Sequence, residues 1–263
     1  MHSLSEFPKA IAANIKVVLF DIDDTLTTHG KLTASAYAAL ERLRDNGKIV
    51  IPITGRPAGW CEHIARMWPV DAVVGENGAF YFRYDHAHKK FTQRFVTPDT
   101  ERANAKRQLA AIAKKILRDV PGAALASDQA YRECDIAIDF CEDVAALPAH
   151  QIANIKALME AHGLTAKVSS IHVNGWFGDY DKLSTTKLLL QEVWAMDLSL
   201  QQHECVFIGD SPNDAPMFGF FDNAVGVANV RAFAGVLTHE PAYVTAAASG
   251  AGFVELVALL LAG

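Results

Sequence analysis

The fold is constrained most by short apolar runs that alternate with helix-forming stretches. The first run, Lys16–Asp21 (KVVLFD), and the second, Lys48–Thr54 (KIVIPIT), show no alternation of apolar and polar residues. Such strands must be buried on both faces, as in the centre of a parallel sheet. A third run, Asp71–Gly75, follows at a similar spacing. Strand, helix and strand in this order predict a right-handed parallel α/β sheet.

Helices are predicted between these runs. The stretch Thr33–Asn46 carries an apolar stripe, with Thr33 as a suitable N-cap and Gly47 as a suitable stop. A second helix is predicted over about 58–68. Residues 79–84 and 91–96 alternate around a polar turn, which predicts a hairpin.

From about residue 97 the pattern changes to helix, strand, strand, repeated twice. The predicted elements there are a helix at Thr100–Val120, strands at 123–127 and 131–140, a helix at 148–162, and strands at 164–169 and 171–177. The parallel pattern then resumes, with a helix at Ser184–Ala195, strands at Glu204–Asp210 and Asn223–Ala228, and a terminal helix from Phe253 to Leu261. We therefore expect an α/β core split between 1–96 and 178–263, with an α+β cap domain (αββαββ) inserted at 97–177.

The charge balance and the spacing of the cysteines indicate which kind of partner and which cellular compartment to expect. Lys+Arg 24 against Asp+Glu 30 gives a net charge of -6, which disfavours nucleic acid but leaves room for a small phosphorylated ligand. The four cysteines are widely spaced and are expected to be reduced thiols. The N-terminal stretch has no signal-peptide pattern and no segment is long enough to span a membrane, so a cytoplasmic protein is expected.

Polar clusters follow three of the predicted parallel strands: Asp21–Thr25 (DIDDT), Thr54–Pro57 (TGRP) and Gly209–Asp214 (GDSPND). Taken alone, the first is equally well explained as a turn or helix cap, and the second is more often a turn or N-cap. The acids of the third are costly to crowd together without a cation.

Together the clusters place four acids around one point: Asp21, Asp23, Asp210 and Asp214. Oxygen donors without nearby His or Cys suit a hard cation such as Mg²⁺. A positive side chain that could balance a phosphate arrives where the chain re-enters the core, as either Lys182 or Lys187.

At this point the sequence resembles a known family. DIDDT at 21–25, ITGRP at 53–57, DKLSTTK at 181–187 and GDSPND at 209–214 resemble, in order, the four motifs of the haloacid dehalogenase superfamily. The inserted paired αββ units and the NGA turn at 77–79 are similar to the type IIB branch, which holds Cof-like and sucrose-phosphate phosphatases. The resemblance implies a Rossmann-like parallel-sheet core.

The resemblance also implies roles for individual residues. Asp21 would be the nucleophile and Asp23 the general acid and base. Thr54 and Lys182 would hold the transferring phosphoryl oxygens, and Gly55 and Asn213 would complete the phosphate-binding set. Mg²⁺ would be bound by Asp21, the Asp23 carbonyl and Asp210, with Asp214 in support.

At one position the sequence departs from the family pattern, and at another two lysines could fill the same family role. Asp24 stands where the family often has Gly, although Asp tolerates tight turns. Lys182, just before the predicted helix, fits the family position better, and Lys187 is the reserve, with a solvated helix residue as its other interpretation.

The expected activity is Mg²⁺-dependent hydrolysis of phosphomonoesters of small metabolites, with a sugar phosphate as the expected substrate, through an aspartyl-phosphate. One alternative is a phosphomutase of the same architecture, similar to phosphomannomutase. Another is a non-catalytic sensor of phosphorylated metabolites. A dehalogenase is disfavoured because the acid Asp23 serves phosphate-ester chemistry rather than halide displacement.

Overall fold

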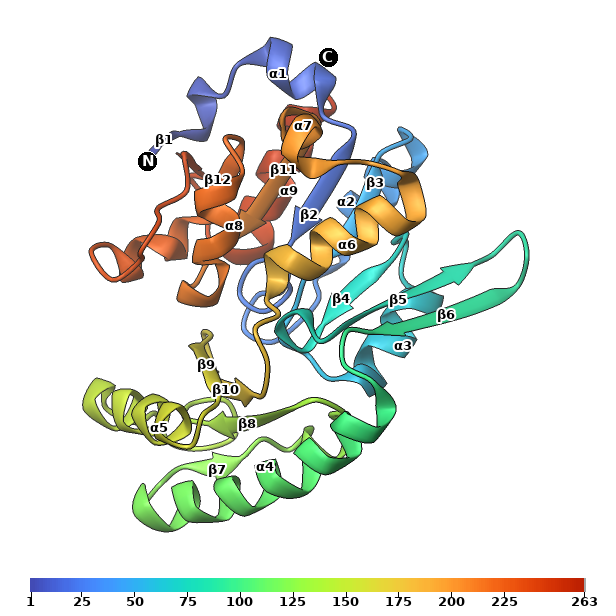
Figure 1. Ribbon diagram of the computed structural model, residues 1–263. Helices are drawn as coiled ribbons and strands as arrows, with labels where there is room; N and C mark the ends of the chain where they lie inside the picture. Colours follow the sequence, from blue (N-terminus) through green and yellow to red (C-terminus); the bar gives the residue numbers. More distant parts are fainter. Residues whose placement is uncertain (263) are drawn as a thin grey trace.

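The computed structural model describes residues 1–262. A six-stranded parallel sheet forms its centre, in the order β1-β13-β12-β11-β2-β3 (Figure 1). The strands are β1 (His2–Ser3), β2 (Val17–Phe20), β3 (Ile49–Pro52), β11 (Cys205–Gly209), β12 (Ala224–Gly226) and β13 (Tyr243–Val244). Every residue of β2 is fully buried, as the unbroken apolar run predicts. The short pairing of β1 with β13 has no signal in the sequence, because two residues show no periodicity.

Helices cover both faces of this sheet. Val18 and Phe20 of β2 pack with α1 (Lys9–Asn14), α2 (Ala34–Asp45), α3 (Ala58–Met67) and α9 (Ser249–Leu260). Val17 and Leu19 pack on the other face with α6 (Lys182–Trp194), α7 (Leu198–Gln201) and α8 (Ala215–Phe220). This arrangement confirms the predicted α/β fold class.

The predicted signals for the start and stop of α2 are confirmed. The Thr33 hydroxyl accepts a hydrogen bond from the Ala36 N–H at 3.3 Å, which caps the first turn. Past the last turn, Gly47 has a φ of +72°, a conformation that glycine adopts without steric cost.

The predicted hairpin is present as β5 (Phe80–Asp85) and β6 (Lys90–Phe95). It forms a three-stranded antiparallel sheet with β4 (Val73–Gly75) rather than standing alone. A parallel bridge between Ile53 and Val74 joins this small sheet to the end of β3.

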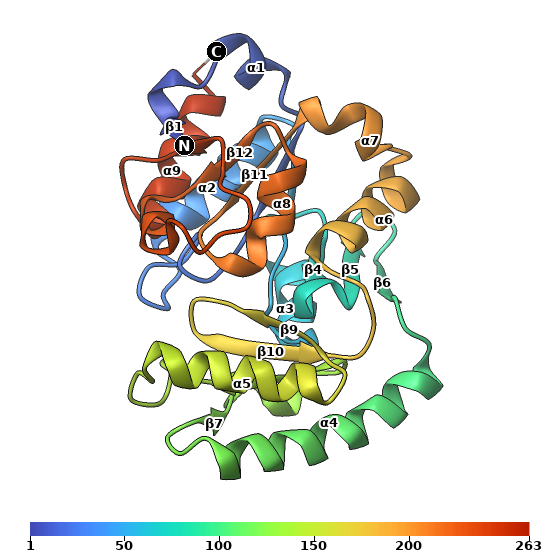
Figure 2. The ribbon, with the colours of Figure 1, turned by 60° about the vertical axis from the view of Figure 1, so that its left-hand side comes forward.

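Residues after the hairpin form a second α+β unit. Its elements are α4 (Asp99–Asp119), β7 (Ala124–Leu125), β8 (Asp135–Asp139), α5 (Ala149–Ala161), β9 (Thr165–Val168) and β10 (His172–Trp176). The sheet is antiparallel in the order β7-β8-β10-β9, and both helices cover one of its faces (Figure 2). We call this unit the cap.

The strand predicted at 131–140 is shorter than expected. Its first residues belong to a 3₁₀ turn at Gln129–Tyr131 and to Arg132, and pairing begins at Asp135. The turn is held by the buried Arg132, whose guanidinium contacts Asp128 and Asp135, and these contacts replace sheet pairing.

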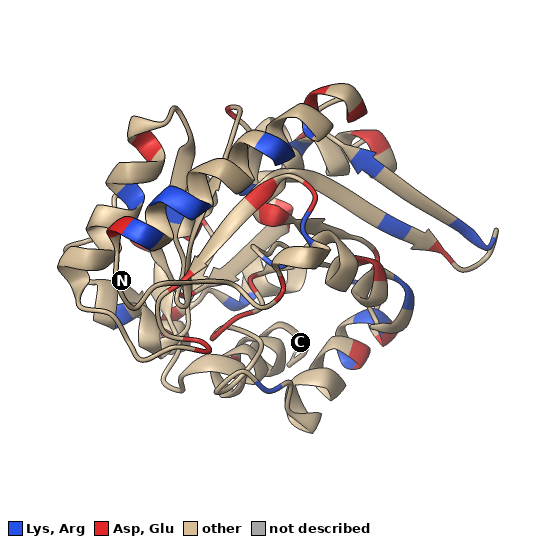
Figure 3. Ribbon diagram, turned by 90° about the horizontal axis from the view of Figure 1, so that it is seen from below, with Lys and Arg blue, Asp and Glu red and all other residues tan. Residues whose placement is uncertain are grey.

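Viewed from the cap side, acidic and basic residues are interspersed along the ribbon (Figure 3). All four cysteines are free thiols, as expected. Within residues 1–262, no helix combines the length and apolar character needed to cross a membrane.

Candidate active site

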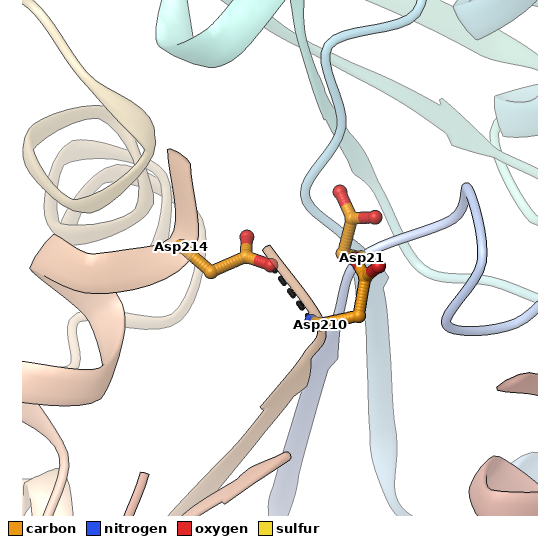
Figure 4. Close-up of side chains that lie close together, drawn as sticks. All are labelled: Asp21, Asp210 and Asp214. Carbon is orange, nitrogen blue, oxygen red and sulfur yellow. Dashed lines mark hydrogen bonds between the residues drawn. The ribbon is translucent and has the colours of Figure 1, made fainter. Parts of the chain in front are cut away.

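Three buried carboxylates meet at the carboxyl ends of β2 and β11. Asp21 follows β2 and Asp210 follows β11, and their strands are paired neighbours in parallel register. Asp214 comes from the 3₁₀ turn Pro212–Asp214, and its Oδ2 accepts the Asp210 N–H at 3.0 Å, the dashed line in Figure 4. Carboxylate oxygens of the three residues lie within 4.8 Å of one another.

Lys182, the first residue of α6, joins this cluster. Its ammonium donates to Asp21 Oδ1 at 2.6 Å and to Asp214 Oδ1 at 2.7 Å, and the lysine is 2% exposed. Burial alone lowers the pKa of Lys182, but the carboxylates of Asp21 and Asp214 raise it above its usual value. Asp181 accepts the Ser184 N–H at 2.7 Å and so fixes the start of the helix and the position of Lys182.

Lys187 lies apart from the cluster. It is exposed one turn further along α6, where its ammonium lies 4.0 Å from the centroid of the Phe220 ring. Of the two lysines considered from the sequence, the structure therefore brings Lys182 to the carboxylates.

The electrostatics of the cluster favour a bound cation. Burial is the main cause that raises the pKa of Asp21 and of Asp210; the Lys182 ammonium opposes the rise and the neighbouring carboxylates add to it. One ammonium cannot balance three carboxylates at this distance. Buried oxygen donors with an excess of negative charge fit Mg²⁺, which prefers oxygen ligands.

Asp210 is oriented by two further side chains. The Thr25 hydroxyl donates to Asp210 Oδ1 at 3.3 Å, and Asn229 Nδ2 donates to Asp210 Oδ2 at 3.1 Å. Asn229 also donates to the Asp24 carbonyl at 3.1 Å. Asp24 has a φ of +56°, so the turn that often uses glycine is formed here by aspartate.

The Asp23 side chain has a different partner. Its carboxylate accepts two hydrogen bonds from Arg56 Nε, at 2.9 and 3.0 Å, and one from Nη2 at 2.8 Å. Arg56 Nη2 also donates to Glu142 of the cap at 2.7 Å. Asp23 and Asp21 still line one small cavity, whereas the Asp23 carboxylate lies outside the group of three.

Three of the predicted phosphate-binding residues, Thr54, Gly55 and Asn213, lie on two adjoining loops. Thr54 is fully buried, and its hydroxyl accepts the Arg56 N–H at 3.0 Å. Asn213 Nδ2 donates to Asn77 Oδ1 at 3.1 Å. Asn77 also packs on Gly55, where an added Cβ would come within 3.2 Å of Asn77 Nδ2. Asn77 therefore holds the loops of Gly55 and Asn213 side by side.

The turn that carries Asn77 is tightly constrained. Glu76, Asn77 and Gly78 have φ values of +43°, +54° and +111°. A Cβ on Gly78 would lie 2.1 Å from the Asp181 carbonyl oxygen, so glycine is required for this close approach to α6. Glu76 is fully buried and accepts the Ala58 N–H at 2.9 Å and the Cys134 N–H at 2.6 Å, which ties the core to the cap.

Side chains of the cap complete the small cavity. Together with Asp21 and Asp23, its lining consists of Gly55, Arg56, Arg132, Ser169, Ser170, Ile171, His172, Asn174, Ser211 and Asn213. Arg132 Nη1 donates to the Gly55 carbonyl at 2.9 Å. Sequence reasoning assigned no role to the cap residues, or to Arg56, Glu76 and Asn77. Arg56 and Asn77 lie inside quoted motifs, whereas Arg132 and Asn174 carry no local signal.

The chain is similar to known proteins both in sequence and in fold. Residues 18–120 match the family model of haloacid dehalogenase-like hydrolases. A solved structure from Thermoplasma acidophilum has 16% identity and a TM-score of 0.69, with 94% of this chain and 98% of that chain covered. The chain has the haloacid dehalogenase-like fold. The family resemblance is thereby confirmed, and so is the expected enzyme class, since the matching model describes hydrolases.

Two further similar structures are phosphatases by name. The sucrose-phosphatase of Synechocystis sp. PCC6803, solved with sucrose and phosphate, has 16% identity and a TM-score of 0.62, covering 93% of this chain and 97% of that chain. A haloacid dehalogenase subclass IIB sugar phosphatase has 15% identity and a TM-score of 0.57, covering 88% and 93%. At these identities the likeness establishes the fold. No curated protein matches the sequence.

Proposed function

We propose that the protein is a phosphatase that hydrolyses phosphomonoesters of small metabolites in the cytoplasm, with sugar phosphates as the first substrates to test. The observation that carries this proposal is the buried ammonium of Lys182 between Asp21 and Asp214, directly beside Asp210. A nucleophilic carboxylate needs such positive charge close by when it receives an anionic phosphoryl group.

In the first step, Asp21 attacks phosphorus and the bond from phosphorus to the alcohol oxygen breaks. Asp23 gives its proton to the departing oxygen, so the products are an aspartyl-phosphate and the free alcohol. In the second step Asp23 takes a proton from water, whose oxygen attacks phosphorus. Inorganic phosphate leaves and the Asp21 carboxylate is restored.

The phosphoryl oxygens would be held by Thr54, Gly55, Lys182 and Asn213. Gly55 and Asn213 line the small cavity, and Lys182 binds Asp21, which lines it as well. Mg²⁺ would be held by Asp21, Asp210 and the main-chain carbonyl of Asp23. Asp214 would position Asp210 and Lys182 through the hydrogen bonds that it accepts from the Asp210 N–H and the Lys182 ammonium. Bound there, the ion would supply positive charge that neutralises carboxylates and phosphate together.

Release of the Asp23 carboxylate from Arg56 is part of the proposal. Asp23 must reach the departing oxygen to act as an acid, whereas its carboxylate is bound to the Arg56 guanidinium through Nε at 2.9 Å and Nη2 at 2.8 Å. Glu142 and Asp128 of the cap already contact the same guanidinium. We propose that residues 97–177 act as a cap domain over a core of 1–96 and 178–263, so that these acids keep Arg56 paired when Asp23 turns to the substrate.

The test is phosphate release from a panel of phosphorylated metabolites with Mg²⁺, repeated after removal of divalent ions by EDTA. We expect stoichiometric inorganic phosphate that disappears with EDTA and returns with Mg²⁺. A phosphorylated isomer in place of inorganic phosphate would instead identify a phosphomutase. Binding of a metabolite without turnover of any ester would identify a sensor and overturn the phosphatase.

A further inference from the structure

A second cavity of about 430 Å³ lies beside the small cavity of Asp21. The two cavities share the side chains of Asp23 and Arg56 in their walls. In the proposed reaction, Asp23 meets the oxygen of the departing alcohol. The larger cavity therefore lies on the side of the site where that alcohol must be accommodated, and its size is that of a small-molecule pocket.

The lining of the second cavity is mostly apolar and comes mostly from the core. Four of the lining residues lie on α3 or just after it: Trp60, His63, Ile64 and Trp68. Four others belong to the segment after β2: Ile22, Thr27, Gly30 and Leu32. Trp60 is 43% exposed although it is a large apolar side chain. An exposed tryptophan at the wall of a cavity offers a flat surface that a ligand can cover.

Most polar groups of the wall already have partners. The Thr27 hydroxyl donates to the Ile22 carbonyl and accepts the Asp24 N–H, each at 3.2 Å. Arg56 and Glu142 bind each other at 2.7 Å, and Glu142 also lies 2.9 Å from His172 Nε2.

Within residues 1–262, the polar side chains of this wall that make no hydrogen bond of their own are His63, Trp60 and Trp68, which offer one imidazole ring and two indole N–H groups. The hydroxyls of a hexose would have to compete with the existing contacts among Asp23, Arg56 and Glu142, and a hydroxyl buried without a partner is costly. A planar apolar ring has no such requirement and gains from contact with the tryptophans.

Within the proposed phosphatase function, we propose that this cavity binds the leaving alcohol and selects phosphomonoesters whose alcohol carries a planar aromatic ring. Trp60 and Trp68 are the specificity-determining side chains. Trp60 has the Arg56 guanidinium 4.6 Å from its ring centroid, and the same guanidinium binds the Asp23 carboxylate, so Trp60 lies close to the residue that meets the alcohol oxygen.

The test compares esters of primary alcohols, so that the intrinsic reactivity of the leaving group is similar. With benzyl phosphate, glucose 6-phosphate and ethyl phosphate, we expect kcat/KM to be at least about tenfold higher for benzyl phosphate than for either of the others. Equal or higher values for glucose 6-phosphate would overturn the proposal.

Variants locate the effect. We expect Trp60→Ala and Trp68→Ala each to lower kcat/KM for benzyl phosphate about tenfold, while kcat/KM for ethyl phosphate changes by less than about twofold. Trp60→Phe keeps an aromatic ring and should retain most of the kcat/KM for benzyl phosphate. Trp194→Ala is the matched control, because Trp194 is half-buried on the opposite face of the central sheet. Equal losses for benzyl and ethyl phosphate would contradict a role in selecting the ring.

A binding measurement separates this inference from the proposed function. Benzylphosphonate cannot be hydrolysed, and ligand-observed NMR detects its binding with or without catalysis. Binding that Trp68→Ala abolishes, in a protein that hydrolyses nothing, would support the pocket and contradict the phosphatase. Hydrolysis of ethyl phosphate with no benzylphosphonate binding would support the phosphatase and contradict the pocket.

Discussion

The central sheet and the cap sheet bury their residues in different ways. The central strand β2 reads Val-Val-Leu-Phe and is apolar on both faces, because helices cover each face. In the cap, β8 reads Asp-Ile-Ala-Ile-Asp, and all five residues are buried as well. Its isoleucines pack under α4 and α5, while Asp135 and Asp139 lie on the other face. Strands β2 and β8 are thus equally buried, but β2 buries only apolar side chains whereas β8 also buries two carboxylates.

This difference shows where the polar wall of the site comes from. Asn174 of β10 donates to Asp135 Oδ2 at 2.9 Å, and Arg132 Nη1 donates to both Asp135 oxygens at 3.1 Å. These buried polar groups are satisfied by one another, which limits the cost of removing them from water. The central strands β2 and β11 present polar groups past their ends, whereas β8 and β10 of the cap also present them along one face of the sheet.

The largest expected effect concerns the strand end of the central sheet. Asp21→Asn removes the carboxylate that attacks phosphorus, so we expect kcat to fall by about 10⁴-fold or more while the circular dichroism spectrum is unchanged. Asp45→Asn, an exposed aspartate at the end of α2, is the control and should keep full activity. Normal turnover by the Asp21→Asn variant would show that Asp21 is not the nucleophile.

The next effect concerns the ammonium in the same cluster. Lys182→Ala leaves the buried Asp21 and Asp214 without their cation, and we expect the free energy of unfolding in EDTA to fall by about 3–5 kcal/mol. Lys187→Ala on the same helix should change it by less than about 0.5 kcal/mol, since that side chain is exposed. Urea denaturation measures both, and similar small losses would show that the cluster does not depend on Lys182.

A third pair of variants compares the two faces of the cap sheet. Ile138→Ala leaves a void under the cap helices and should destabilise the protein by about 2–5 kcal/mol with KM unchanged. Asn174→Ala, on the face toward the core, should cost only about 1–3 kcal/mol but alter KM, because Asn174 lines the small cavity. Urea denaturation and steady-state kinetics would be measured on both, and a change in KM for Ile138→Ala alone would reverse the assignment of the faces.

The smallest effect concerns the contact between cap and core in acid. Partial burial raises the pKa of Glu142, but the hydrogen bonds from His172 and Arg56 lower it from its usual 4.5 to about 2. A lowered pKa stabilises the folded protein above pH 4.5, and that contribution is lost as the pH falls toward 2.

Glu142→Gln should therefore be less stable than the natural protein near neutral pH. The difference should shrink between pH 4.5 and 2 in thermal unfolding followed by circular dichroism. A difference that stays constant over this range would show that the charge of Glu142 does not hold the cap to the core.

Much of the fold could be predicted because its signals are local. Apolar runs located β2, β3 and β11, and a capping threonine with a following glycine bounded α2. Of the proposed site, Asp21, Asp210 and Asp214 could be grouped because parallel strands end at one edge of a sheet. Their roles stay predictions until the variants are measured.

What only the tertiary structure decided is pairing between distant residues. Arg56 meets Glu142 across 86 positions of sequence, and Lys182 meets Asp21 across 161. The choice between Lys182 and Lys187, the partner of Asp23 and the apolar cavity beside it all depend on how segments that are far apart in the sequence pack together. Periodicity and capping act over a few residues, so the sequence determined the elements, and long-range packing determined which charged side chains meet.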